Sequence, residues 1–91
     1  MKDYEVHITM RPGATRRYTH ELVDGKRAGI MDATPGQRGW IWYHDPDDAS
    51  IPFHRVHTSV VESVKDIGKD IVVTTMNTIY RFTPCNESVA V

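Results

Sequence analysis

The stretch DIVVTTMNTIYRFT, from Asp70 to Thr83, is the most regular part of the chain and decides its fold class. Side chains along a strand alternate between two faces, and a two-residue turn fixes which residues lie opposite each other. Asn tolerates the positive φ that such turns need, so Met76 and Asn77 are the expected turn. One face then carries the pairs Thr75 with Thr78, Val73 with Tyr80, and Ile71 with Phe82. The stretch therefore predicts an antiparallel hairpin with one core face and no reactive group.

Length and composition limit the class of protein. The chain has 91 residues, of which 40% are hydrophobic and 25% are charged. These values predict a single globular domain over residues 1–91, with a loose tail at residues 84–91. No apolar run approaches the ~20 residues of a membrane span, so we expect no membrane partner.

The N-terminus and the cysteine content bear on the compartment. The opening residues MKDYEVHITM lack the apolar region of a secretory signal. Cys85 is the only cysteine, which rules out an intrachain disulfide and disfavours a thiolate zinc site. A cytoplasmic location fits these features best.

Charge is distributed unevenly, although the formal net charge is only -1. The segment from Arg11 to Arg38 holds six basic and three acidic residues, whereas the segment from Asp45 to Asp70 holds six acidic and three basic residues. A chain with this balance is a poor general binder of phosphate backbones. A local basic patch in the first half remains compatible with the sequence.

Three further segments have strand patterns. Residues 4–10 alternate apolar and polar side chains, and residues 40–44 form a short apolar and aromatic run closed by the turn sequence DPDD. In residues 15–31, Asp24 and Gly25 stand where a hairpin turn would join two strands. Pro52 argues against a central strand in residues 50–59, so we expect an edge strand or an extended loop there.

Residues 59–67 fit two patterns. Ser59 and Glu62 have the spacing of a helix capping box, with Val60, Val64 and Ile67 at helical spacing. Valine is an indifferent helix former, however, and a strand here would lead directly into the last hairpin. We favour the strand and leave the helix open. The whole pattern predicts a mostly β fold, a small antiparallel barrel or sandwich of six or seven strands, with an SH3-like barrel preferred and at most one short helix.

The chemistry-bearing residues do not form a known catalytic or metal motif. His54 and His57 are three residues apart, which places them on opposite faces of a strand, so we predict no metal site and no cofactor. Cys85 and the serines lack the local sequence of a nucleophile. A small nuclease that uses His20, His44 or His57 is a less favoured hypothesis, and enzymatic activity stays open.

Arginines stand beside aromatic residues in two segments. RPGATRRY contains Arg16 and Arg17 next to Tyr18, and GQRGW contains Arg38 next to Trp40. Such groups can hold phosphates and stack on bases, as in small barrels that bind single strands. They support a nucleic-acid-binding β-barrel as the alternative function.

The segment WIWYH is apolar on both faces. Trp40 and Trp42 point one way, while Ile41 and Tyr43 point the other. Because a domain of this size has few positions covered on both faces, we expect exposed aromatic side chains at an interface with a partner or a second copy of the chain. The candidate binding residues are Trp40, Trp42, Tyr43, Arg16, Arg17 and Arg38.

The pattern HTSVVESV followed by DIVVTTMNTIYRF, over residues 57–83, resembles the C-terminal β-meander of small phage and prophage proteins. Its residues are structural, so the resemblance implies a fold and no active site. It also implies a phage or mobile-element origin, where small proteins often block a host defence protein by binding it. The favoured function is therefore a cytosolic protein-binding inhibitor of a host protein that acts by occlusion.

Overall fold

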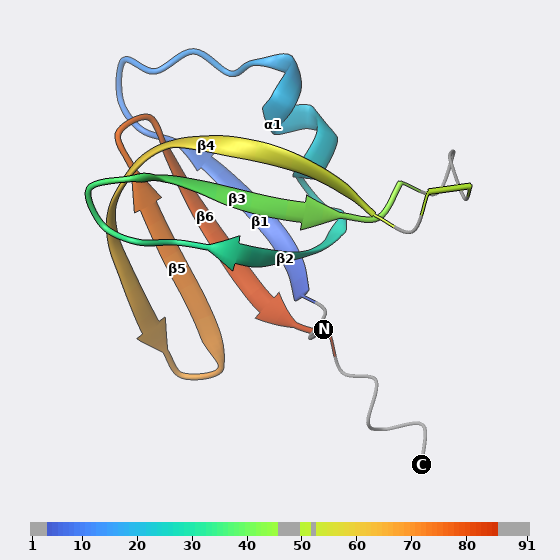
Figure 1. Cartoon of the computed structure of the whole chain (residues 1–91). Coiled ribbons are helices and arrows are strands. Elements are labelled where there is room, and N and C mark those ends of the chain that lie inside the picture. The colour runs from blue at the N-terminus through green and yellow to red at the C-terminus, as the bar shows by residue number, and fades with distance from the viewer. Residues whose placement is uncertain (1–3, 46–49, 52, 86–91) are drawn as a thin grey trace.

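The described residues form a closed, six-stranded antiparallel barrel with one short helix. The structure, a computed structural model, describes residues 4–45, 50–51 and 53–85. The elements follow one another as β1 (Tyr4–Met10), α1 (Tyr18–Val23), β2 (Arg27–Asp32), β3 (Arg38–Tyr43), β4 (His54–Ile67), β5 (Asp70–Thr75) and β6 (Thr78–Pro84). Each strand pairs with its neighbours in sequence, and β1 pairs with β6 to close the ring (Figure 1). The predicted mostly β, antiparallel fold is confirmed.

The last hairpin has the predicted register. Ile71 lies opposite Phe82, and Val73 lies opposite Tyr80. The turn differs from the prediction, because within the described part of the chain only glycines have positive φ. Asn77 is therefore not in the left-handed region. Instead, the Thr75 hydroxyl closes the turn by accepting a hydrogen bond from the Thr78 N–H and donating one to the Thr78 carbonyl, both at 3.1 Å.

The two alternatives for residues 59–67 are resolved in favour of the strand. These residues belong to β4, a strand of 14 residues whose first half pairs with β3 and whose second half pairs with β5. One long strand thus joins the two sides of the barrel. Pro52, on which the expectation of an edge strand or loop rested, lies outside the described residues. The predicted strand at residues 40–44 corresponds to β3, which begins two residues earlier and ends at Tyr43. Of the DPDD turn, residues 46–48 lie outside the described residues.

The predicted strand before Asp24 is wrong, because residues 18–23 form α1. Gly25 does reverse the chain, with φ of +76°, but it follows a helix and not a strand. On the edge of β1 that faces β2, strand pairing covers only Tyr4 and Glu5. Beyond Glu5, hydrogen bonds from the turn after α1 replace the pairing with a strand. Gly25 N–H donates to the Val6 carbonyl (2.7 Å), and Ile8 N–H donates to Oδ1 of Asp24 (3.1 Å). The helix turns Val23 inward, where its side chain is 1% exposed.

The barrel interior is a continuous hydrophobic core. The edge of the Tyr4 ring packs against Phe82, with ring centroids 6.0 Å apart and an interplanar angle of 85°. The buried members of the core are Tyr4, Val6, Val23, Ala28, Ile41, Tyr43, Val61, Val73, Tyr80 and Phe82. Pro84, expected in a loose tail, pairs with Tyr4 at the end of β6; residues 86–91 lie outside the described part. In the segments described, no helix has the length and apolar character needed to cross a membrane.

Candidate anion-binding pocket

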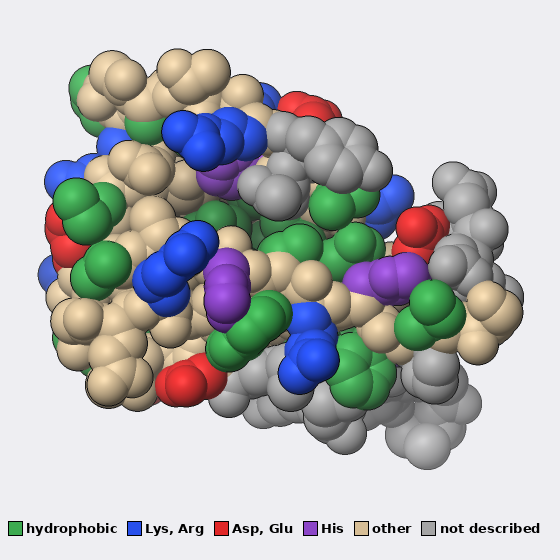
Figure 2. All heavy atoms as spheres, turned by 45° about the horizontal axis from the view of Figure 1, so that its top comes forward, with side chains coloured by type: hydrophobic (Ala, Val, Ile, Leu, Met, Phe, Trp, Pro, Cys, Tyr) green, Lys and Arg blue, Asp and Glu red, His purple; other side chains and the backbone are tan. Residues whose placement is uncertain are grey.

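A pocket is lined by the segment before α1 and by the β5–β6 turn. Figure 1 shows this segment crossing above that turn at one end of the barrel. Its volume is about 340 Å³. Its lining comes from several separate segments of the chain: Gly13, Ala14, Thr15, Arg17, His20, Arg38, His57, Thr58, Ser59, Asn77 and Tyr80. The lining contains arginines, histidines and hydroxyl groups, and no Asp or Glu from the described residues. We call this site the basic pocket; Figure 2 looks towards this end and shows Lys, Arg and His side chains around a hollow.

A β-bulge positions Arg38 at the basic pocket. Between the pairs Arg38–Val60 and Trp40–His57, the single residue Gly39 faces two residues of β4, Thr58 and Ser59. The Gly39 N–H donates to the Thr58 hydroxyl (2.9 Å), and a Cβ at Gly39 would lie 2.7 Å from the Asp32 carbonyl oxygen. Nε of Arg38 donates to the Thr58 carbonyl at 3.0 Å. This contact orients the guanidinium and leaves its terminal nitrogens available to a ligand.

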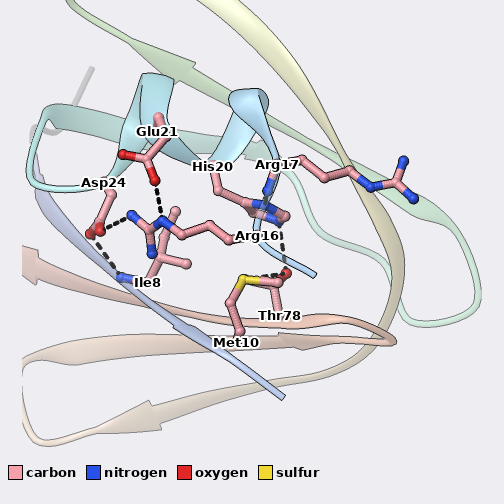
Figure 3. A network of polar contacts seen from close by, with 8 residues as sticks. All are labelled: Ile8, Met10, Arg16, Arg17, His20, Glu21, Asp24 and Thr78. Atoms are coloured by element: carbon pink, nitrogen blue, oxygen red, sulfur yellow. Dashed lines mark hydrogen bonds and ion pairs between the residues drawn. The ribbon is translucent and has the colours of Figure 1, made fainter. Parts of the chain in front are cut away.

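His20 anchors Arg17 at another part of the pocket lining. The Arg17 N–H donates to Nδ1 of His20 (2.9 Å), and Nε2 of His20 lies 2.9 Å from Oγ1 of Thr78 (Figure 3). The Thr78 hydroxyl donates to Sδ of Met10 (3.9 Å), so Nε2 of His20 is the protonated nitrogen. Burial, and then the positive charges of Arg16 and Arg17, lower the pKa of His20. The imidazole is therefore neutral at pH 7 and serves as a structural wall of the pocket.

Arg16 and Arg17 are adjacent but have different roles. Arg16 forms ion pairs with Glu21 and Asp24, which raise the pKa of its guanidinium. Partial burial opposes ionisation of Asp24, but the hydrogen bonds from Arg16 and from the Ile8 N–H outweigh it and lower the pKa of that carboxyl. The side chain of Arg17 extends away from this network (Figure 3). Of the two, only Arg17 lines the basic pocket.

The floor of the basic pocket is closed by buried polar groups. Thr58 is 1% exposed, and its hydroxyl donates to the Ser59 carbonyl at 2.6 Å. The Ser59 hydroxyl donates to Oγ1 of the buried Thr75 at 2.7 Å. Tyr80 is also buried, and burial raises the pKa of its phenol. The buried side of the pocket is therefore lined by polar groups whose hydroxyls are fixed by hydrogen bonds within the barrel.

A strip of stacked side chains lies beside the basic pocket, formed by Trp40 of β3 with Arg55 and His57 of β4. The ring centroids of Trp40 and His57 are 3.4 Å apart, and the guanidinium carbon of Arg55 lies 5.3 Å from the Trp40 ring. Arg55 and His57 are exposed, while Trp40 is half-buried between them. We call these three residues the β3–β4 strip. His57 belongs to both the strip and the pocket lining.

Two of the predicted binding residues are not exposed. Trp42 is 2% exposed, because its indole covers Gly29 and contacts the rings of His44 and Phe53. Tyr43 is 5% exposed and belongs to the core. The expectation of an exposed aromatic pair is therefore wrong for Trp42, and the strand is covered on both faces at this position. Trp40, Arg17 and Arg38 lie around one end of the barrel, whereas Arg16 is held in its own ion pairs.

Sequence reasoning missed part of the site. It considered His57 only for metal binding or catalysis, and it did not single out Ser59, Asn77 or Arg55 for binding. The strand alternation of residues 54–60 opposite Trp40 was the available signal for Arg55 and His57, whereas no local pattern points to Asn77. In the part of the chain that the structure describes, no three His, Cys, Asp or Glu side chains gather closely enough to hold a metal ion.

Comparisons with known proteins identify no relative of this chain. No protein-family model, curated protein or solved structure matches the chain.

Proposed function

We propose that the protein binds single-stranded nucleic acid through the basic pocket and the β3–β4 strip. One observation carries the proposal: Arg17 and Arg38 line a concave site without a carboxylate among its described residues, and this site continues into an exposed Arg55 stacked on Trp40. Phosphate binding needs cations that are not already neutralised, and these three arginines have no ion pair among the described residues. Arg11, Arg16 and Arg81, in contrast, each pair with a carboxylate.

The strip supplies the second component of single-strand recognition. A guanidinium that lies over an aromatic ring keeps its other face available for stacking on a base. Trp40 thus acts as the support for Arg55 and not as a free platform, because His57 also packs against its ring. A strand that places a phosphate in the basic pocket would extend along His57 to a base stacked on Arg55.

The overall charge limits the strength of this binding. With a net charge of -1, the chain has no general attraction for nucleic acid, so affinity depends on the few local cations. The three arginines can neutralise at most three phosphate charges, so the slope of log K against log salt concentration should be no steeper than about -2 for a single strand. Binding should therefore be moderate and should weaken gradually with salt.

The test is fluorescence anisotropy with labelled single-stranded DNA and RNA of about 12 nucleotides, a length that suits one small barrel. Arg38→Gln should weaken binding several-fold and reduce the salt slope by about 0.7, whereas Arg55→Gln should weaken binding several-fold through the lost stacking. Lys69→Gln is the matched control, since Lys69 is an exposed cation in the turn between β4 and β5. Equal effects of all three changes would show that only net charge matters and would reject the site.

A protein partner is the other outcome of this test. The sequence-based hypothesis of a cytoplasmic inhibitor that occludes a host protein would be favoured if neither nucleic acid binds at about 50 mM salt. An acidic side chain would then be the group that enters the basic pocket. The exposed apolar residues of β4 do not strengthen this alternative, because Val64 and Ile67 are three residues apart and lie on opposite faces of the strand.

A further inference from the structure

We propose that the basic pocket is a site for a phosphomonoester, so that the protein prefers the phosphorylated end of a strand to its interior. This inference rests on the proposed nucleic-acid binding and specifies which group of the ligand enters the pocket. It follows from the shape, the charge and the donors of the site.

The shape of the pocket favours a chain end. Three of the lining residues, His20, Thr58 and Tyr80, are only 8%, 1% and 4% exposed, so they close the inner side of the pocket. An internal phosphodiester has a nucleotide on both sides and cannot enter a site closed on its inner side without a sharp turn of the strand. A terminal phosphate has one neighbour only. The volume of about 340 Å³ is at the lower end of the range for small-molecule sites and suits a single nucleotide.

The charge of the pocket favours a dianion. A phosphomonoester carries a charge of about -1.5 to -2 at pH 7, compared with -1 for a phosphodiester. Arg17 and Arg38 line the pocket from two separate segments, one ahead of α1 and the other on β3. His20 is not a third cation, because its two ring nitrogens are engaged by Arg17 and Thr78. Two guanidinium groups therefore match the two charges of the ligand.

Further hydrogen-bond donors complete the site. A phosphomonoester has three terminal oxygens, each of which accepts hydrogen bonds. The side chains of Asn77, Thr15 and His57 also line the pocket, and each carries an N–H or O–H group. The hydroxyls of Ser59 and Thr75 are used in the floor, so they maintain its shape and are not the donors.

The experiment compares one oligonucleotide sequence in three forms: with a 5′-phosphate, with a 3′-phosphate and with two free hydroxyl ends. A nucleoside 5′-monophosphate and inorganic phosphate serve as competitors, which separates a strand end from a free nucleotide and from the bare anion. We expect the oligonucleotide with a phosphate at one of its ends to bind about tenfold tighter or more than the unphosphorylated strand. The reason is that charge-assisted hydrogen bonds would hold the added phosphate. Arg17→Gln and Arg38→Gln should abolish this preference.

Arg55→Gln provides the contrast, because Arg55 lies on the β3–β4 strip and does not line the basic pocket. This variant should weaken all three oligonucleotides equally and keep the preference for the phosphorylated end. Circular dichroism checks that each variant is folded. If the three forms bind equally well and binding still depends on Arg55, the phosphomonoester site is rejected while nucleic-acid binding stands. If no oligonucleotide binds but the monophosphate does, the pocket assignment stands and the proposed function fails; if neither binds, both fail.

Discussion

His20 and Thr78 are 58 residues apart in the sequence, yet Nε2 of His20 lies 2.9 Å from Oγ1 of Thr78. This contact ties α1 to the first residue of β6 across the end of the barrel. A helix of six residues is too short to be stable by itself, so its position depends on such tertiary contacts. Because the other ring nitrogen of His20 accepts the Arg17 N–H, the contact also fixes one wall of the basic pocket.

His20 makes stability depend on pH. Its pKa in the folded protein is lowered below the ordinary value of 6.5, so in the window below 6.5 the unfolded chain binds a proton that the folded chain does not. The free energy of unfolding should therefore fall as pH drops below about 6.5. Above that pH, titration of His20 should not change it. Urea denaturation between about pH 5 and 8 measures this change.

The control for this prediction is His20→Asn. The Asn side-chain oxygen can accept the Arg17 N–H in place of Nδ1, but it does not titrate. The difference in unfolding free energy between the two proteins should be largest at pH 8 and shrink towards pH 5. A difference that stays the same over this range would mean that His20 titrates normally in the folded state.

Phe82→Ala tests the core face of the last hairpin. Phe82 is fully buried at 0% exposure and packs against Tyr4, so its truncation should lower the free energy of unfolding by about 3–5 kcal/mol. Ile67→Ala is the matched control, because this residue is 49% exposed and its loss should change stability by less than about 1 kcal/mol. Equal melting temperatures for wild type and Phe82→Ala would contradict the register of β5 and β6.

The two tryptophans should behave differently in acrylamide quenching. Trp42 lies over Gly29 at 2% exposure, so a Trp40→Phe protein should retain blue-shifted emission that acrylamide quenches weakly. A Trp42→Phe protein should show more accessible emission from Trp40, and a bound single strand should protect it. Strong quenching of Trp42 in the free protein would contradict the covered outer face of β3.

Substitutions at Arg16 and Arg17 distinguish a charge that stabilises the fold from a charge that binds the ligand. Arg17→Gln should weaken binding of single-stranded DNA several-fold, because this side chain lines the basic pocket. Arg16→Gln should change the affinity less than about twofold, since Glu21 and Asp24 already neutralise Arg16. It should lower stability only slightly, because the three partners are partly exposed and solvent screens the ion pairs. The same loss of affinity in both variants would show that the two charges act through the overall potential.

Alternation in the sequence was sufficient to predict β1, β6 and the pairing of Val73 with Tyr80, and an apolar and aromatic run bounded by turn residues was sufficient to predict β3. It was not sufficient for residues 18–23, because a turn such as Asp24–Gly25 reverses the chain equally well after a helix or a strand. The same limit applies to Trp42. An apolar residue on the second face of a strand can be exposed or covered, and the choice depends on the distant Gly29 and Phe53.

The sequence by itself thus determined the class of fold and the strands, since side-chain period and turn chemistry act between residues a few positions apart. Only the tertiary structure decided which cations lie together and remain unpaired. Arg16 and Arg17 look equivalent in the sequence, but α1 presents Glu21 and Asp24 to one and leaves the other at the basic pocket. Arg38 reaches the same pocket from 21 positions away because the barrel closes through β1 and β6. Charge neutralisation depends on distance in space, and closure of the barrel sets those distances.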